Sequence, residues 1–188
     1  MTATLNASTS AGVILTSDTS GNLAVQSNGT TVGTFSSAGF TYTTPSTAQP
    51  AFSAYQSSNQ TISSSTFTKV TFDTEVFDTN SNFASSTFTP TVAGYYQIQA
   101  SVETNWTTTQ FNAFTVSIYK NGSNYARGNG GYLNNTSGDI EILATTLAYA
   151  NGSTDYFEVY AYQNSGSAKT IYNDAGLTSF NGCMVRSA

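Results

Sequence analysis

The sequence of 188 residues contains no histidine, one cysteine and only five lysines and arginines. Without histidine, Ser-His-Asp and Cys-His catalytic groups and histidine-based metal sites are excluded. No glycine-rich phosphate loop follows a strand pattern and opens a helix, so nucleotide chemistry is not indicated. Neighbouring carboxylates such as Asp155 and Glu158 are more simply interpreted as surface charges than as a glycosidase pair. We therefore expect a protein that is not an enzyme.

Positive charge is scarce, and none of it precedes Lys69. With a net charge of −5, the chain has no basic cluster for phosphate groups, so neither nucleic acid nor an anionic membrane is expected as a partner. No apolar run is long enough to span a bilayer, which argues against membrane insertion. Met1–Leu5 lacks the positive charge and apolar core of a secretory signal, so we expect synthesis in a cytoplasm without export by that route.

The single cysteine, Cys183, has no second cysteine with which to form an internal disulfide. It stands in the apolar run Cys183-Met184-Val185. Free cysteine is among the most buried residue types, and we expect this thiol to lie in the core.

What the chain does contain favours β-structure. Charged residues are 8% of the sequence, and aromatic residues are 13%, with 12 Tyr and 12 Phe. Tyr, Phe and Thr fit pleated strands better than helices, and no window is dominated by strong helix formers. Disordered chains are poor in aromatic residues, so this one is expected to fold.

Residues 1–44 are predicted to be an extended, β-rich N-terminal arm. Short apolar runs alternate with turn signals, of which Asn28-Gly29 is the strongest hairpin signal. The arm has few large apolar residues, so we expect it to become ordered by pairing with copies of itself or by docking on a partner. Residues 45–50, with two of the three prolines, are predicted to be a linker.

Residues 51–188 are predicted to form one β-sandwich domain. Tyr96, Ile98, Ala100 and Val102 alternate with polar residues, and so do the apolar residues of 114–118 and 157–161. Many short alternating strands with frequent turns indicate a sandwich or barrel. The segment Ile140–Tyr149 is apolar on both faces and is predicted to be a central strand.

Tyrosine occupies the second face of the predicted strand at 156–162. Tyr156, Tyr160 and Tyr162 alternate there with Phe157, Val159 and Ala161. Because tyrosine combines an apolar ring with a polar tip, this face predicts an oligomer interface, with a merely solvent-exposed face as the alternative.

A bound Ca²⁺ ion is a weaker prediction for the loop Asp78–Asn82. Its oxygen-bearing side chains alternate like the start of an EF-hand loop, but the glycine and the closing glutamate are missing. Side-chain-to-backbone turns are the alternative explanation, and no other cofactor is indicated.

The order of these motifs resembles the C1q domain, a TNF-like jelly roll. The signature residues are matched by Phe72, Asp78, Phe83, Phe88, Gly94 and Tyr96. The spacing from Phe83 to Phe88 is two residues short, and Ile98 replaces a phenylalanine. Further similar segments are Ala51–Ala54, Tyr119–Gly122, Leu147–Val159 and Phe180–Gly182. The resemblance implies an all-β, C1q/TNF-like jelly-roll sandwich of ten strands that assembles as a homotrimer.

The arm resembles a different group of proteins. Residues 12–23 and 26–30 are similar to segments of virion proteins from tailed phages, notably marine and cyanobacterial phages. No collagenous Gly-x-y repeat is present, which argues against the innate-immunity role of animal C1q proteins.

Together these features predict a trimeric virion structural protein. The arm would anchor it to capsid or tail proteins, and the jelly roll would project as a decoration, cement or short fibre protein. The alternative is a receptor-binding fibre tip that recognises host-surface glycan, and a bacterial C1q-like adhesion module ranks third. Candidate ligand residues for the glycan reading are Trp106, Tyr125 and Tyr132, with Asn129, Asn134 and Asn135 nearby in the sequence.

Overall fold

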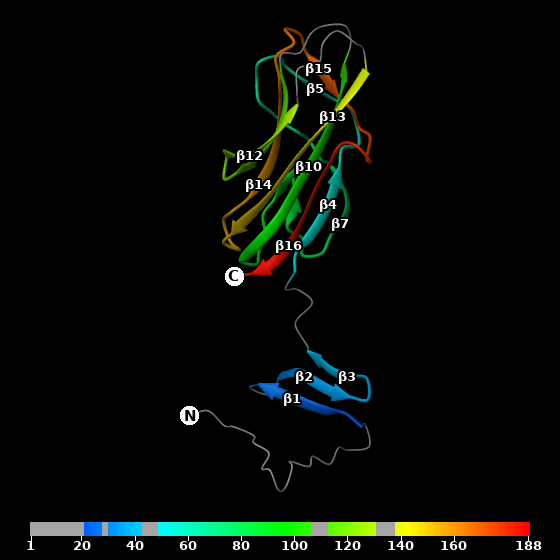
Figure 1. Cartoon of the computed structure of the whole chain (residues 1–188), viewed down its shortest axis with the longest axis vertical. Coiled ribbons are helices and arrows are strands. Elements are labelled where there is room, and N and C mark those ends of the chain that lie inside the picture. The colour runs from blue at the N-terminus through cyan, green and yellow to red at the C-terminus, as the bar shows by residue number, and fades with distance from the viewer. Residues whose placement is uncertain (1–20, 28–29, 43–48, 107–112, 131–137) are drawn as a thin grey trace. The chain divides into compact units, whose positions relative to one another are not determined.

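The computed structural model describes residues 21–27, 30–42, 49–106, 113–130 and 138–188. All regular structure in these ranges is β-strand (Figure 1). Within them, no helix is long and apolar enough to cross a membrane. The chain divides into two compact units, residues 1–46 and 47–188, and this boundary falls inside the segment predicted to be a linker.

The N-terminal unit contains a three-stranded antiparallel sheet in the order β1-β2-β3. Its strands are β1 (Leu23–Ser27), β2 (Thr30–Ser36) and β3 (Gly39–Tyr42). The predicted hairpin joins β1 to β2, with Ser27 opposite Thr30. The turn residues Asn28 and Gly29, and the predicted apolar run at 13–15, lie outside the described residues.

The second unit is a sandwich of two sheets. The first, called here the β10 sheet, has seven strands in the order β5-β15-β10-β16-β4-β7, with β13 paired to the other edge of β10. Its strands are β4 (Ala51–Tyr55), β5 (Gln60–Ile62), β7 (Thr74–Asp78), β10 (Gly94–Trp106), β13 (Gly138–Ala150), β15 (Lys169–Ile171) and β16 (Ser179–Ser187).

The other sheet, called the β14 sheet, has six strands in the order β12-β11-β14-β9-β8, with β6 paired to β14. Its strands are β6 (Thr68–Lys69), β8 (Phe83–Ala84), β9 (Thr87–Phe88), β11 (Phe114–Lys120), β12 (Ser123–Gly130) and β14 (Phe157–Gln163). All pairings between named strands are antiparallel, as a jelly roll requires.

The core lies between these sheets and follows the predicted alternation. Tyr96, Ile98, Ala100 and Val102 of β10 are buried, and so are the inward residues of β11 and β14. Phe52 stands at the centre, with its ring 5.0 Å from Phe83 and 4.2 Å from Phe88. Rings offset in this way add to the stability that burial alone provides.

The short spacing between Phe83 and Phe88 is explained by a tight hairpin. Phe83 pairs with Phe88 and Ala84 with Thr87, which leaves Ser85 and Ser86 as a two-residue turn. Both serines have positive φ, 50° and 59°, as a type I′ turn demands. Relative to the spacing of the signature, the two missing residues are therefore absent from the turn, and both phenylalanines still lie in the core.

Two predictions about individual segments are wrong. β13 is hydrogen-bonded only to β10 among the described strands, so it is an edge strand and not a central one. Its outward apolar residues Leu143 and Leu147 are exposed. Cys183 is exposed as well, because the period of two along β16 turns Met184 inward and Cys183 outward.

Candidate interaction surfaces

The tyrosines of β14 point away from the core, as predicted, but they are only half-exposed. The Tyr160 ring lies 4.2 Å from that of Tyr119 on the neighbouring β11. Tyr162 packs 4.8 Å from Phe67, a residue of the loop before β6 that the sequence analysis did not single out. The guanidinium of Arg127 lies 5.4 Å from the Phe67 ring centre. These side chains form what we call the aromatic face.

The aromatic face is closed largely by its own members. Beneath it, Ser117 of β11 pairs with Tyr160 on one side and Arg127 on the other, and it is fully buried. The Ser117 hydroxyl has no hydrogen-bond partner within the described part of the chain. The third predicted residue, Tyr156, precedes β14 and is half-buried near Gly122.

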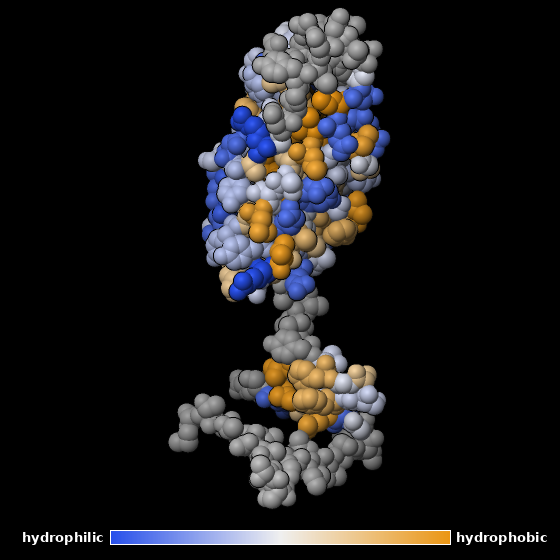
Figure 2. Space-filling view, in the orientation of Figure 1, coloured by the Kyte–Doolittle hydropathy of each residue, from blue (hydrophilic) through white to orange (hydrophobic). Residues whose placement is uncertain are grey.

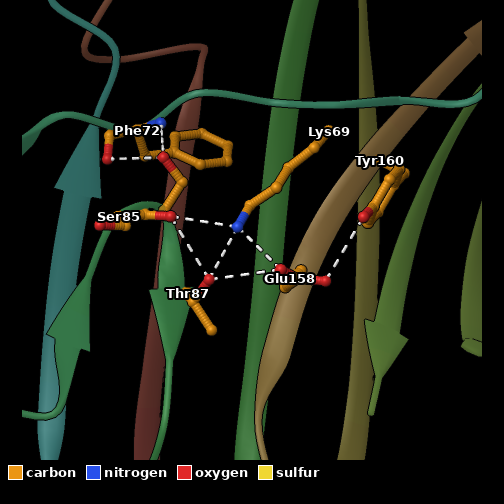
Figure 3. Close-up of polar contacts among 7 residues, drawn as sticks. Lys69, Phe72, Ser85, Thr87, Glu158 and Tyr160 are labelled. Carbon is orange, nitrogen blue, oxygen red and sulfur yellow. Dashed lines mark hydrogen bonds and ion pairs between the residues drawn. The ribbon is translucent and has the colours of Figure 1, made fainter. Parts of the chain in front are cut away.

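A polar network borders the aromatic face (Figure 3). The Lys69 ammonium donates to Glu158 at 2.7 Å, to Thr87 at 2.8 Å and to the Ser85 carbonyl at 3.1 Å. Burial, together with the nearby Glu158 carboxylate, raises the pKa of Tyr160. The network fastens β6 and the β8–β9 turn to β14.

The carboxylates considered as an acid–base pair are each bound to a different lysine. Lys69 lies 2.7 Å from Glu158, and Lys120 lies 3.0 Å from Asp155. Hydrogen bonding from Asn121, aided by Lys120, lowers the pKa of Asp155. Both groups therefore act as counter-ions that connect strands and turns.

The larger exposed apolar surface is on the β10 sheet, on the side away from the core. β13 contributes Leu143, 50% exposed, and Leu147, 56% exposed. The open face is our name for a set of outward residues of β10, β13 and β16: Tyr95, Gln97, Gln99, Leu143, Leu147, Tyr149, Cys183 and Val185. These residues are uncharged; charged outward residues stand at the ends of the sheet, where Arg186 pairs with Tyr95 and Glu103 pairs with Glu141. Figure 2 shows apolar side chains among polar ones over β10 and β16.

The pairing of strands gives the open face a defined layout. Tyr95 stands opposite Tyr149 with ring centres 5.5 Å apart, and Leu147 stands opposite Gln97. A hollow lined by Tyr95, Leu147, Val185 and the C-terminal residues lies at one end. Aromatic and aliphatic side chains around uncharged polar ones are typical of the centre of a protein–protein interface.

Acidic residues mark the other end of this sheet. Glu103 of β10 lies directly opposite Glu141 of β13, and Ser101 donates a hydrogen bond to Glu141. Burial raises the pKa of Glu103, and the charges of Asp139, Asp174 and Glu141 raise it further.

The loop predicted as a calcium site uses its oxygens to close its own turns. The Asp78 carboxylate accepts from the backbone N–H of Asn80 at 3.2 Å and of Phe83 at 2.6 Å. The Asn82 side-chain oxygen accepts from the Thr91 N–H at 3.1 Å. In the part of the chain that the structure describes, no three His, Cys, Asp or Glu side chains gather as metal ligands. The calcium site stays a prediction.

The predicted glycan residues are only partly within the described part of the chain. Tyr125 lies on β12 with 49% of its surface exposed. Trp106 ends β10, but its side chain, like Tyr132, Asn134, Asn135 and the side chain of Asn129, lies outside the described residues. The structure therefore does not test whether these residues form one site.

Comparisons with known proteins identify the fold. No family and no curated protein matches the sequence. Among solved structures, the globular domain of zebrafish complement 1qA protein is 15% identical, with a TM-score of 0.52, and covers 74% of this chain and 99% of its own. Murine APRIL is 12% identical, with a TM-score of 0.53, over 73% of this chain and 99% of its own.

A third structure, Eiger TNF from S. frugiperda, is 6% identical, with a TM-score of 0.52, and covers 75% of this chain and 94% of its own. These identities are low, so the likeness concerns the fold, and function must be argued from the surfaces. The globular unit of this chain has the C1q/TNF-like jelly-roll fold.

Proposed function

We propose that this chain is a structural protein that assembles as a homotrimer through the open face, and that it forms a decoration, cement or short fibre protein of a virion. The observation that carries the proposal is β13, an edge strand whose outward residues Leu143 and Leu147 are apolar and exposed. A sheet face of this composition gains stability only when another surface covers it. The trimer fits the resemblance to C1q domains and needs a closed rotational symmetry.

The open face favours self-association over the aromatic face for a physical reason. The rings of Tyr119, Tyr160, Tyr162 and Phe67 already pack on one another, so a partner would bury little additional surface there. Leu147 and Val185, by contrast, are 56% and 61% exposed. We therefore assign the trimer interface to the open face and leave Tyr156, Tyr160 and Tyr162 as a secondary candidate.

The virion assignment rests on the arrangement along the chain. A small N-terminal unit precedes a jelly roll, and the arm's segments are similar to those of phage virion proteins. The N-terminal unit would attach the trimer to capsid or tail proteins. Mass spectrometry of purified particles that encode this chain should detect it, and its absence from them would contradict the assignment.

The trimer is tested by the mass of the full chain in solution. We expect the wild type to have three times the chain mass and Leu147→Lys to be a monomer, since a lysine cannot be buried unpaired in the interface. Tyr125→Lys, on the other sheet, is the matched control and should stay trimeric. A monomeric wild type, or a trimeric Leu147→Lys, would overturn the proposed interface.

Recognition of a host-surface glycan is the second candidate, favoured by the exposed ring of Tyr125. Sugar rings stack on exposed aromatic side chains, and jelly rolls are common lectin scaffolds. Binding of the wild type on a glycan array, with loss in Tyr125→Ala and Trp106→Ala, would support it. An array without any bound glycan would remove it and leave the structural role intact.

A further inference from the structure

The N-terminal sheet has one apolar face and one polar face. Residues that pair across strands lie on the same side of a sheet. Leu23 and Phe40 both pair with Phe35, and Val25 pairs with Gly33, so these four apolar side chains share one side. The other side is mostly polar and holds Ala24, Val32, Thr34 and Thr41.

The side chains of this apolar face pack on one another but remain exposed. The Phe35 and Phe40 ring centres are 4.5 Å apart, and the Phe40 ring lies so close to Gly33 that a Cβ there would meet it at 2.5 Å. Even so, Phe35 is 49% exposed and Phe40 is 53% exposed. The described part of this unit contains a single sheet, and a stable sheet needs a second layer on its apolar side.

The absence of charge on the sheet restricts which kind of molecule can supply that second layer. Residues 21–42 contain no Asp, Glu, Lys or Arg. The face therefore has no means of selecting a charged partner, such as nucleic acid or a membrane surface. Identical copies of an uncharged face do not repel one another, and each copy supplies the apolar surface that the others lack. On the side that Figure 2 shows, apolar side chains of this sheet lie at the surface.

The area of the face decides how copies come together. A buried phenylalanine covers roughly 150–250 Å², so the exposed parts of Val25, Phe35 and Phe40 amount to roughly 200–300 Å² per copy. A stable interface between free proteins buries about 800 Å² per partner. The face is too small to hold two free chains together, but chains already joined elsewhere present it at an effective concentration on the order of millimolar.

We infer that the apolar face of the N-terminal sheet is covered by the same face of the sister chains, as a second, dependent interface of the trimer. The inference rests on the trimer proposed above, because the jelly rolls must first hold the arms together. The remaining surface of the arm would then attach the trimer to capsid or tail proteins.

Hydrogen exchange of the full-length chain tests whether the N-terminal interface forms and whether it depends on the jelly-roll trimer. In the wild type, the amides of β1–β3 should exchange at least tenfold more slowly than in the Leu147→Lys monomer. Phe35→Asp should lose this protection while its mass stays trimeric. Thr34→Asp, the neighbouring residue on the polar side of β2, should keep it.

The outcomes separate the two proposals. A trimeric wild type whose β1–β3 exchange is unchanged by Phe35→Asp would overturn the arm interface and leave the jelly-roll trimer standing. A monomeric wild type would overturn both. Protection of β1–β3 that persists in Leu147→Lys would mean that another part of the same chain covers the face, which also contradicts the inference.

Crosslinking provides a direct contact measurement. In a Cys183→Ser background, Val25→Cys on the apolar side should form interchain disulfides upon mild oxidation of the trimer. Ala24→Cys, the adjacent residue on the polar side, is the matched control and should remain largely reduced. Equal crosslinking of the two variants would contradict face-to-face packing.

Discussion

At the scale of single residues, Ser85 and Ser86 share a strained backbone but differ in what their side chains do. Ser86 is buried, and its hydroxyl accepts from the Phe72 N–H at 2.8 Å and donates to the Phe72 carbonyl at 3.1 Å. The Ser85 side chain is exposed. The left-handed conformation costs an L-residue about 1–2 kcal/mol, which glycine avoids.

Ser85→Gly should therefore stabilise the protein by about 0.5–1 kcal/mol, since relief of strain exceeds the added chain entropy. Ser86→Gly relieves the same strain but leaves the buried Phe72 N–H unsatisfied, at a cost of about 1–3 kcal/mol, and should be less stable than wild type. Urea unfolding of both variants measures the difference. Two equal shifts of the same sign would show that the hydrogen bonds to Phe72 contribute nothing.

Asp155 joins two turns through charged hydrogen bonds. Its carboxylate accepts from the Asn121 side chain at 2.7 Å and from the Asn151 N–H at 3.0 Å. Because its pKa in the folded chain is lowered, its contribution is present above the unfolded value of about 3.9 and is lost as pH falls through the folded value.

Asp155→Asn should thus be less stable than wild type at pH 7, by about 1.5–3 kcal/mol, the usual value for hydrogen bonds to a charged group. The difference should shrink as the pH is lowered below 4. Thermal unfolding at pH 7 and pH 3 checks this, with the exposed Glu75→Gln as the control for loss of a carboxylate. A deficit that does not change with pH would contradict the assigned role of the charge.

At the scale of strands, the β10–β13 pair places Glu103 directly against Glu141. The pKa of Glu103 is raised, so the folded chain binds this proton more tightly than the unfolded chain. Stability then falls as pH rises from the unfolded value of about 4.3 through the raised value. At neutral pH the folded chain is therefore destabilised by burial of the ionised Glu103 carboxylate and by its repulsion from Asp139, Asp174 and Glu141.

Glu103→Gln is expected to stabilise the protein at pH 7 by about 0.2–1 kcal/mol, the range for a cross-strand pair. At pH 3, where the glutamate is protonated, the variant and the wild type should unfold at the same temperature. Thermal unfolding at one fixed protein concentration provides the comparison. A stabilisation that is as large at pH 3 as at pH 7 would rule out the charge of Glu103 as its cause.

The strands also show how far the sequence predicts this structure. Alternation along 96–102 and 157–161 correctly predicted which side chains enter the core, because one face of each of those strands is covered by the other sheet. In β13 the same reasoning failed, since an exposed apolar residue on an edge strand looks in sequence like one buried in the core. Phe67 lies in a loop without periodicity, so nothing in its spacing placed it on the aromatic face.

At the scale of the whole molecule, Cys183 reports on assembly. It is exposed in the single chain and lies on the open face, opposite Gln97. If three chains meet there, the thiol should react with a maleimide or disulfide reagent at least tenfold more slowly in the wild type than in the Leu147→Lys monomer. Both should react fully in denaturant, and equal rates in the native proteins would place Cys183 outside the interface.

The protein has few lysines, and their side chains are paired or buried, which affects its digestion by trypsin. Lys69 and Lys120 are held in ion pairs, and Lys169 is only 8% exposed. Trypsin has five lysines and arginines to cleave after, and none of them precedes residue 69. The three lysines should resist this protease in the folded protein, whereas Arg127 and Arg186 are exposed. After complete digestion the first 69 residues would leave as one peptide too long for routine detection. A search of particles by tryptic peptides would undercount this protein, whereas chymotrypsin, with 12 Tyr and 12 Phe to cleave, would reveal it.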